Sequence, residues 1–263
     1  MAIITLLSDW GHSDHYVAAV KAAILCKMPE AIIVDISHEI RAFDIKHAAF
    51  VMSNTWRNFP AGTIHILGME TVESDDHPHL AVLFEGHYFI GADTGLMSLL
   101  FDTPPDQIVE IDVHQDSKYF TFSERDRFAK VAVHLAQGKP LTELGTQTRD
   151  LVRKTLLQPT FSNGIIYGKV AHVDVYQNVF VNIPEHFVVK CFGTKAVTVQ
   201  FKRLQVPMVK AYADVLEGMP CALYASNGFL QIAVNRGKAS TLLGLYMDDE
   251  VLVIRGEESL NLF

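Results

Sequence analysis

Two carboxylates stand close together where the first apolar segment of the chain ends. Asp9 closely follows the strand-like run at 3–7 (IITLL), and Asp14 comes five residues after it, before a segment with helical character. In an open α/β sheet, ligands bind at the carboxyl ends of the strands, and a carboxylate there can accept two hydrogen bonds from a vicinal diol such as a ribose. The structural alternative is that Asp9 shapes the turn or caps the following helix. The residue pattern alone leaves both interpretations open.

A second polar group lies far along the chain, beside a strand-like run. It combines an acid, an aromatic ring and an amide in Asp174, Tyr176 and Asn178. A tyrosine can stack on the face of a purine and an amide can bond to its edge, but the same residue types are common in plain turns. Two further turns are predicted at Ser226-Asn227-Gly228 and Asn235-Arg236-Gly237.

Several standard catalytic motifs are absent from the sequence. There is no GxGxxG after the first strand and no GxxxxGK[ST] segment, so a dinucleotide or triphosphate cradle is not expected, and Ser123 does not stand in a GxSxG motif. The twelve histidines raise the question of a metal, and two of them stand with acids at 74–79 (SDDHPH). Their spacing fits none of the usual ligand patterns, so we predict an exposed polar loop and no metal site.

The composition limits the class of protein. The chain has 263 residues, 49% of them hydrophobic, which is enough for one large domain or two smaller ones. A net charge of −8 argues against nucleic acid or an anionic membrane as the main partner. Cys26, Cys191 and Cys221 lie far apart, which indicates reduced thiols in a cytoplasmic protein. No apolar run is long enough to span a membrane, and Met1 leads straight into a strand, so no signal peptide is expected.

The order of apolar runs predicts two domains of different class. Over residues 1–150, strands alternate with amphipathic helices at 16–27, 44–58 and 126–137, which indicates an α/β domain with a mainly parallel sheet. Residues 139–163 are polar and contain prolines, and we predict a linker there. Over residues 151–263, short runs that include 186–192 (HFVVKCF) predict an antiparallel β domain similar to a small barrel. Two domains of unlike class suggest a ligand site between them.

The order of motifs resembles the S-adenosylmethionine hydroxide adenosyltransferase family, which is related to the fluorinase and chlorinase enzymes. The family pattern TDFG, an acid and YV corresponds to Ser8-Asp9-Trp10-Gly11, Asp14 and Tyr16-Val17. DITHEI corresponds to 35–40 (DISHEI), FPPGTVH to 59–65 (FPAGTIH), VGPDNGL to 90–96 (IGADTGL) and TFHGRDxFAPxAAHLA to 121–136 (TFSERDRFAKVAVHLA). In the second domain, DxFGNxxTNI corresponds to 174–183 and EIAxNxG to 231–237. The similarity covers nearly the whole chain in unbroken order.

The resemblance implies a homotrimer in which each site lies at a subunit interface. The substrate it implies is an adenosyl compound, S-adenosylmethionine, and no cofactor or metal, because the sulfonium is itself an activated leaving group. By analogy Asp9 holds the ribose hydroxyls, Asp14 and Tyr16 lie near the methionine amino group, and Phe43 forms a wall of the ribose pocket. The other implied contacts are Asp174, Ser226 and Asn227 to the amino-acid end, and Tyr176, Asn178, Val234 and Arg236 to the adenine.

Three positions depart from the family pattern at the reacting end of the site. The family activates water with an Asp, an Arg seven residues later and the His of TFHGRD, and these positions hold Glu70, His77 and Ser123 here. In one explanation Glu70 and His77 (or His79) order and deprotonate water in a rewired site. The implied activity is then hydrolysis of S-adenosylmethionine to adenosine and methionine by attack at the ribose C5′ carbon. In the other explanation the chain is a non-catalytic adenosine- or S-adenosylmethionine-binding protein that has lost the reactive residues.

Overall fold

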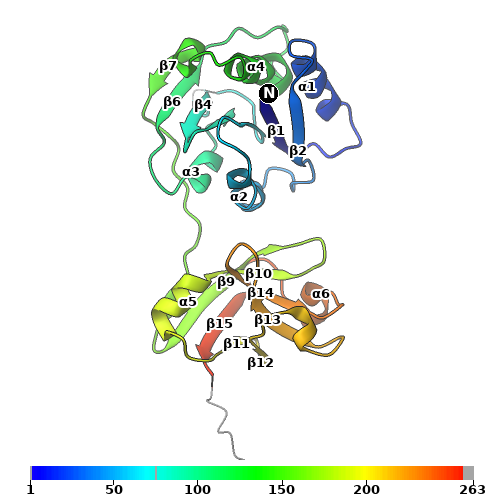
Figure 1. Cartoon of the computed structure of the whole chain (residues 1–263), viewed down its shortest axis with the longest axis vertical. Coiled ribbons are helices and arrows are strands. Elements are labelled where there is room, and N and C mark those ends of the chain that lie inside the picture. Colours follow the sequence, from blue (N-terminus) through cyan, green and yellow to red (C-terminus); the bar gives the residue numbers. More distant parts are fainter. Residues whose placement is uncertain (1, 75, 257–263) are drawn as a thin grey trace, which may run out of the picture. The chain divides into compact units, whose positions relative to one another are not determined.

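The computed structural model describes residues 2–74 and 76–256. The chain folds into two compact units, Met1–Leu156 and Leu157–Phe263 (Figure 1). The first unit has an α/β architecture and the second is built on an antiparallel sheet, which confirms the predicted fold class. Asp75, in the predicted polar loop, lies outside the described residues.

The N-terminal unit is organised around a seven-stranded sheet with the order β2-β1-β3-β5-β4-β6-β7. The first four strands in this order are parallel to one another, whereas β4, β6 and β7 pair antiparallel. The parallel strands are rich in Ile, Leu and Val because helices cover both of their faces. The strands are β1 (Ile3–Ser8), β2 (Ile32–Ser37), β3 (Ile64–Gly68), β4 (His79–Phe84), β5 (His87–Ala92), β6 (Gln107–Ile111) and β7 (Gly145–Thr148).

Helices form a layer on each face of this sheet (Figure 1). α1 (Tyr16–Leu25) and α4 (Ala129–Ala136) pack on one face, where Ile4 and Ile66 lie in the same core cluster as Ile24 and Leu135. α2 (Ile45–Ser53) and α3 (Leu96–Leu100) form the second layer, with a core that includes Leu7, Met52, Phe89 and Leu100. The short helices are η1 (Trp56–Asn58), the π-helical η2 (Glu124–Phe128) and η3 (Leu141–Leu144).

The segment predicted as a linker is partly regular structure. η3 and β7 lie within 139–163, and β7 forms the edge of the sheet by pairing with β6. The polar sequence of β7 (GTQT) does not predict a strand. An edge strand has one neighbour only and does not need an apolar pattern on both faces. Gly145 is required there, since a Cβ would lie 2.0 Å from the carbonyl oxygen of Glu110.

The C-terminal unit contains an eight-stranded antiparallel sheet with the order β12-β11-β15-β9-β10-β14-β13, and β8 pairs with β9. The sheet curls toward a barrel, because Met208, next to β12, forms a bridge with Ala222 in β13. Alternate residues of β9 and β10, such as Val170 and Val181, point into one core. The strands are β8 (Thr160–Ser162), β9 (Ile165–Val173), β10 (Val179–Pro184), β11 (Val197–Phe201), β12 (Leu204–Pro207), β13 (Pro220–Tyr224), β14 (Phe229–Val234) and β15 (Glu250–Arg255).

One predicted strand of this unit is wrong. Residues 186–192 belong to helix α5 (Glu185–Phe192), which begins after Pro184. The buried side chains of this helix are Val188 and Phe192, four residues apart, so the apolar run follows the helical period and not the alternation of a strand. The other helices of the unit are η4 (Tyr212–Asp214) and α6 (Ala239–Leu243).

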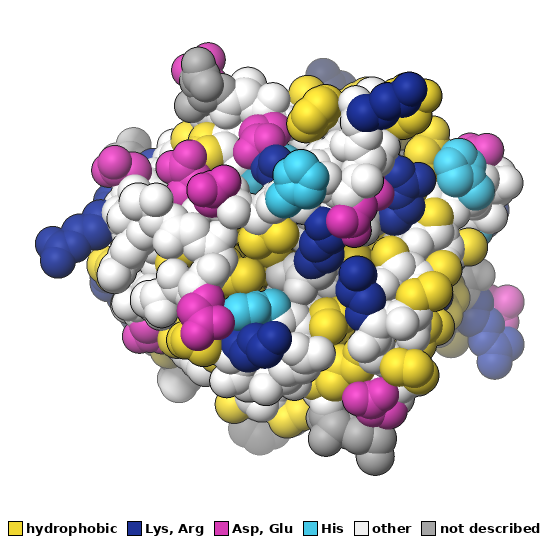
Figure 2. All heavy atoms as spheres, turned by 90° about the horizontal axis from the view of Figure 1, so that it is seen from above, with side chains coloured by type: hydrophobic (Ala, Val, Ile, Leu, Met, Phe, Trp, Pro, Cys, Tyr) yellow, Lys and Arg dark blue, Asp and Glu magenta, His cyan; other side chains and the backbone are white. Residues whose placement is uncertain are grey.

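The described residues contain no helix that is both long enough and apolar enough to cross a membrane. Figure 2 shows one face of the molecule, on which basic, acidic and apolar side chains are interspersed. That face therefore offers no uniformly basic track of the kind that follows a nucleic-acid backbone.

Candidate functional site

The carboxyl ends of the parallel strands carry the first group of predicted site residues. Asp9 follows β1, and its Oδ2 atom accepts a hydrogen bond of 2.9 Å from the backbone N–H of Phe43. Phe43 has a φ of +62°, which is unusual for a non-glycine residue, and its side chain is 72% exposed. Asp9 thus fixes a loop, as the structural interpretation expects. The same bond brings an exposed aromatic residue close to a carboxylate, as a ribose site needs.

A hydrogen-bonded chain, buried at Ser8 and His38 and partly exposed at its other end, holds the strand end that precedes Asp9. Ser8 Oγ lies 2.6 Å from His38 Nδ1, His38 Nε2 lies 3.2 Å from Asp35 Oδ1, and Lys21 Nζ lies 2.5 Å from Asp35 Oδ2. Burial raises the pKa of Asp35, but hydrogen bonds from Lys21 and His38 outweigh it, so the pKa is lowered. The order Ser-His-Asp is that of a hydrolase triad, yet Ser8 and His38 are buried. We therefore assign this chain to positioning the loop and not to nucleophilic attack.

Aromatic packing joins the Asp9 loop to the segment before η2. The ring of Phe122 meets Trp10 edge-on at 5.9 Å and Tyr16 at 5.3 Å between centroids. Trp10 also lies against the end of β3, where a Cβ on Gly68 would be 2.4 Å from the indole ring. Tyr16 is 38% exposed and Asp14 is exposed as well, so both side chains remain available on the surface of the N-terminal unit.

The loop between β3 and β4 carries the residues predicted to activate water. Glu70 is exposed and has a φ of +48°. His77 is exposed, and its Nδ1 donates to the backbone carbonyl of Asp93 at 3.0 Å, which leaves Nε2 as the acceptor nitrogen. The carboxylate of Asp93 is held by Val152, whose backbone N–H donates to both its oxygens at 3.0 and 2.9 Å.

His79, the other histidine of this loop region, is fully buried. Its Nε2 lies 3.0 Å from the carbonyl oxygen of Thr71 and its Nδ1 lies 3.0 Å from Arg127 Nη1. A carbonyl only accepts and a guanidinium only donates, so His79 is a neutral ring with the proton on Nε2. Burial lowers the pKa of His79 and favours this form. Arg127 also contacts Glu73 at 2.5 Å, so His79 anchors the loop and does not face the site.

Sequence reasoning missed Glu124, the most buried carboxyl near this group. Glu124 is 4% exposed, and its Oε1 accepts a hydrogen bond of 2.5 Å from Thr71 Oγ1. Ser123, the predicted site residue beside it, is 3% exposed. The only signal in the sequence is an acid in the motif TFSERD where the family pattern has glycine. That signal is weak, because an acid next to Arg and Asp is usual on a helix surface.

In the C-terminal unit, the predicted purine-binding group forms the turn between β9 and β10. Asp174 accepts from the backbone N–H of Asn178 at 2.8 Å and from its side-chain Nδ2 at 3.1 Å. These two hydrogen bonds shape the turn, as the structural alternative for these residue types expects. They also fix the Asn178 side chain with its Nδ2 atom directed to Asp174. The ring of Tyr176 at the tip is 73% exposed and is free to stack on a planar group.

The other predicted residues of this unit lie at the two ends of β14. The Ser226-Asn227-Gly228 turn is confirmed as a hairpin between β13 and β14, closed by Gly228 N–H to the Ala225 carbonyl at 2.8 Å. Val234 and Arg236 lie at the opposite end, in a turn where Gly237 N–H donates to the Val234 carbonyl. Strand pairing puts Asn178 near Val234, whereas Ser226 and Asn227 are roughly 17 Å away along the strand.

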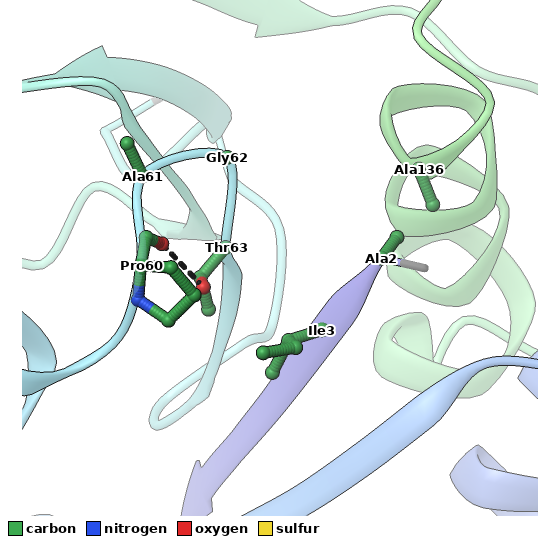
Figure 3. A pocket seen from close by; sticks show the side chains of 7 residues that line it. All are labelled: Ala2, Ile3, Pro60, Ala61, Gly62, Thr63 and Ala136. Carbon is green, nitrogen blue, oxygen red and sulfur yellow. Dashed lines mark hydrogen bonds between the residues drawn. The ribbon is translucent and has the colours of Figure 1, made fainter.

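Within the described residues, neither the histidines nor a surface pocket at the opposite strand ends indicates a second functional site. In residues 2–74 and 76–256, no three His, Cys, Asp or Glu side chains gather as they would around a metal ion. A hollow of about 300 Å³ lies at the amino ends of β1 and β3 (Figure 3). Its lining is small or apolar apart from Thr63, whose hydroxyl donates to the Pro60 carbonyl at 2.7 Å. The hollow is at the strand ends opposite to Asp9 and does not belong to the candidate site.

An α/β unit with acidic and aromatic residues at its carboxyl strand ends, followed by a curled β unit, defines the class of this protein. Residues 4–145 match the SAM hydroxide adenosyltransferase N-terminal domain and residues 168–252 match the C-terminal domain, so the chain belongs to this family. The match confirms the resemblance drawn from the motifs.

Relatives of known name and solved structures cover nearly the whole chain. It is 29% identical to the (R)-S-adenosyl-L-methionine hydrolase of Methanocaldococcus jannaschii, over 96% of this chain and 95% of the relative. It is 26% identical to a fluorinase of Actinoplanes, over 89% of this chain and 91% of the relative. Among solved structures, a conserved protein of Thermotoga maritima is 31% identical with a TM-score of 0.88, over 96% of this chain and 100% of that one.

Proposed function

We propose that this protein hydrolyses S-adenosylmethionine to adenosine and L-methionine. The observation that carries the proposal is the match of both units to one family, with hydrolase relatives that align over 93–96% of the chain. The placement of Asp9 and Phe43 at the carboxyl end of β1 supports it, because a diol and a sugar ring need an acceptor pair and an apolar wall.

Roles follow for the binding residues. Asp9 accepts the ribose hydroxyls and Phe43 covers the sugar, while Asp14 and Tyr16 hold the methionine ammonium. Tyr176 stacks on the adenine and Asn178 bonds to its edge, with the backbone of Val234 and Arg236 beside it. Ser226 and Asn227 complete the amino-acid end, whereas Asp174 holds Asn178 through two hydrogen bonds.

For this hydrolysis the protein must align and activate a water molecule. The C5′–S bond breaks as the water oxygen attacks C5′, and methionine leaves as a neutral thioether. The site must place water opposite the leaving sulfur and exclude other water. We propose that Glu70 and His77, beside Ser123, order this water at the rim of the site. The exposure of Glu70 and the acceptor Nε2 of His77 support this role.

Glu70→Gln is expected to lower kcat at least about tenfold and to leave the Kd for adenosine within about twofold. The reason is that the lost charge acts on water and not on the adenosyl group. Initial rates and calorimetry with adenosine measure the two effects. Glu30→Gln, a change at an exposed position just before the amino end of β2 and so away from the carboxyl strand ends, serves as the matched control. An unchanged kcat would remove Glu70 from the reaction.

The direct test is incubation of the purified protein with S-adenosylmethionine over a broad pH range, with adenosine followed by chromatography. Release above a buffer blank supports the hydrolase. The second candidate function is a binding protein without turnover, which is favoured by the loss of the family Asp, Arg and His at positions 70, 77 and 123. Tight binding in calorimetry without adenosine release would establish that second function.

We also propose that the working protein is a cytoplasmic homotrimer in which the β unit of a neighbouring subunit completes each site. The exposure of Phe43 and Tyr176, at 72% and 73%, supports a site that is covered by a second surface. Light scattering on the eluting protein is expected to give three times the chain mass of 29.4 kDa. A monomer at working concentration would contradict a shared site.

A further inference from the structure

We propose that Glu124 is the catalytic residue that accepts the proton of the attacking water, with Thr71 as its hydrogen-bond partner. This inference rests on the proposed hydrolase function and names a residue that replaces the altered family groups. It is drawn from three features of the described residues: burial, contacts and local helix geometry.

The first feature is the burial of the Glu124 side chain. Its side chain is 4% exposed, whereas Glu70 at the rim is exposed to solvent. A charged carboxylate in such a place needs strong partners or takes up a proton. Burial raises the pKa of Glu124, and the nearby charge of Asp9 adds to the effect, while Thr71 opposes it. A buried carboxyl with a raised pKa, held in place by a hydroxyl donor, is suited to accept and release a proton during a reaction.

The second feature is the position of Glu124 among the site residues. Thr71, which donates to Glu124 at 2.5 Å, directly follows Glu70 in the β3–β4 loop. Asp9, the proposed ribose residue, is close enough to repel the Glu124 carboxylate electrostatically. Phe122, two residues before Glu124, packs on Trp10 and Tyr16 of the Asp9 loop. Glu124 therefore lies at the junction of the ribose residue and the water-ordering loop.

The third feature is the π-helical geometry of η2, Glu124–Phe128, which runs directly into α4. A π-turn admits one extra residue per turn and often marks a functional site. Here Glu124 and Asp126 are buried at 4% and 5%, while the side chain of Arg125 between them is 38% exposed. The local geometry thus turns two acids inward. Arg125 neutralises Asp126 at 2.6 Å, so the carboxyl left for proton transfer is that of Glu124.

The charged groups around Glu124 define the expected pH dependence. The charge of Asp9, in the β1–α1 loop, raises the pKa of Glu124, and Arg125 and Asp126 form their own pair on η2. Arg127 and His79 lie beyond Thr71, where they bond to each other and hold the loop.

In the proposed step the water oxygen bonds to C5′, the C5′–S electron pair stays on sulfur, and one water proton passes to the Glu124 carboxylate. The resulting neutral acid then returns the proton to solvent.

The test compares Glu124→Gln with the wild type in steady-state hydrolysis of S-adenosylmethionine. Gln has the same shape but is a far weaker base, so kcat is expected to fall about 100-fold or more, with KM within about threefold. Glu30→Gln is the matched control, and circular dichroism checks folding. Retention of more than half of kcat by Glu124→Gln would overturn the assignment while leaving the hydrolase function intact. A wild type without turnover would instead overturn the hydrolase function and, with it, the proton acceptor.

A second variant keeps the inference testable if Glu124→Gln does not fold. Thr71→Val removes the hydroxyl that stabilises the charged carboxylate, so the acid limb of the kcat profile is expected to move upward by about one pH unit. A purely structural role of Thr71 would lower kcat at every pH and leave the position of the limb unchanged, and that result would contradict the proposal.

Discussion

Asp9→Ala is expected to weaken adenosine binding by about 2–3 kcal/mol, roughly 30- to 150-fold in Kd. The loss has two sources. The carboxylate would hold both ribose hydroxyls in a largely desolvated site, and it also fixes the Phe43 backbone through the 2.9 Å bond to Oδ2. Without it, the wall of the sugar pocket would lose its position as well. Calorimetry with adenosine measures the effect without any need for turnover.

Asp9→Asn separates the two sources. Its side-chain oxygen can still accept from Phe43 N–H, but the amide nitrogen is a donor and cannot accept from a diol. We expect Asp9→Asn to retain the thermal stability of the wild type and to lose most of the affinity that Asp9→Ala loses. Adenosine affinity within twofold of the wild type in both variants would mean that the acid serves the loop alone.

Acid is expected to destabilise the N-terminal unit through His65, by about 2–3 kcal/mol between about pH 7 and about pH 4.5. His65 is fully buried, its Nδ1 lies 2.7 Å from Thr5 Oγ1, and its Nε2 lies 3.1 Å from His87 Nδ1. Burial, followed by the charge of His87, lowers its pKa from 6.5 to about 3. Below pH 6.5 the unfolded chain binds a proton that the folded chain refuses, so stability is lost as the pH falls toward 3.

Urea unfolding at several pH values measures this loss. Both tryptophans, Trp10 and Trp56, lie in the N-terminal unit, so their fluorescence follows that unit alone. His65→Gln is expected to be less stable at neutral pH but to show a flatter dependence on pH, since Gln does not titrate. His114→Gln, at an exposed position, is the matched control and should keep the wild-type slope. A His65→Gln slope equal to that of the wild type would assign the acid sensitivity to other groups.

Much of the fold could be predicted from the sequence because the parallel strands are nearly continuous apolar runs and the helices follow the helical period. The sequence of α5 predicts a strand, because a short run of Val and Phe fits both periods until its buried partners are known. The sequence of β7 predicts a linker, because an edge strand made of polar residues has no local signature.

The residues of the candidate site likewise include some that the sequence predicts and some that it does not. Asp9 and Asp174 could be proposed because an acid at a strand end or turn is visible in the chain. Glu124 could not, since its burial depends on the π-helical geometry of η2 and on Thr71, a hydrogen-bond partner far away in sequence. The neutral tautomer of His79 likewise depends on Arg127 and on the carbonyl of Thr71. Neither residue is an immediate neighbour of His79 in the sequence.

The most direct test of the account is the origin of the 5′ oxygen in the product. S-adenosylmethionine is incubated with the protein in water enriched in heavy oxygen, and the adenosine is examined by mass spectrometry. Attack of water at C5′ predicts one heavy oxygen at the 5′ position of adenosine and an equal amount of methionine. Adenosine without the label, or no adenosine at all, would contradict it.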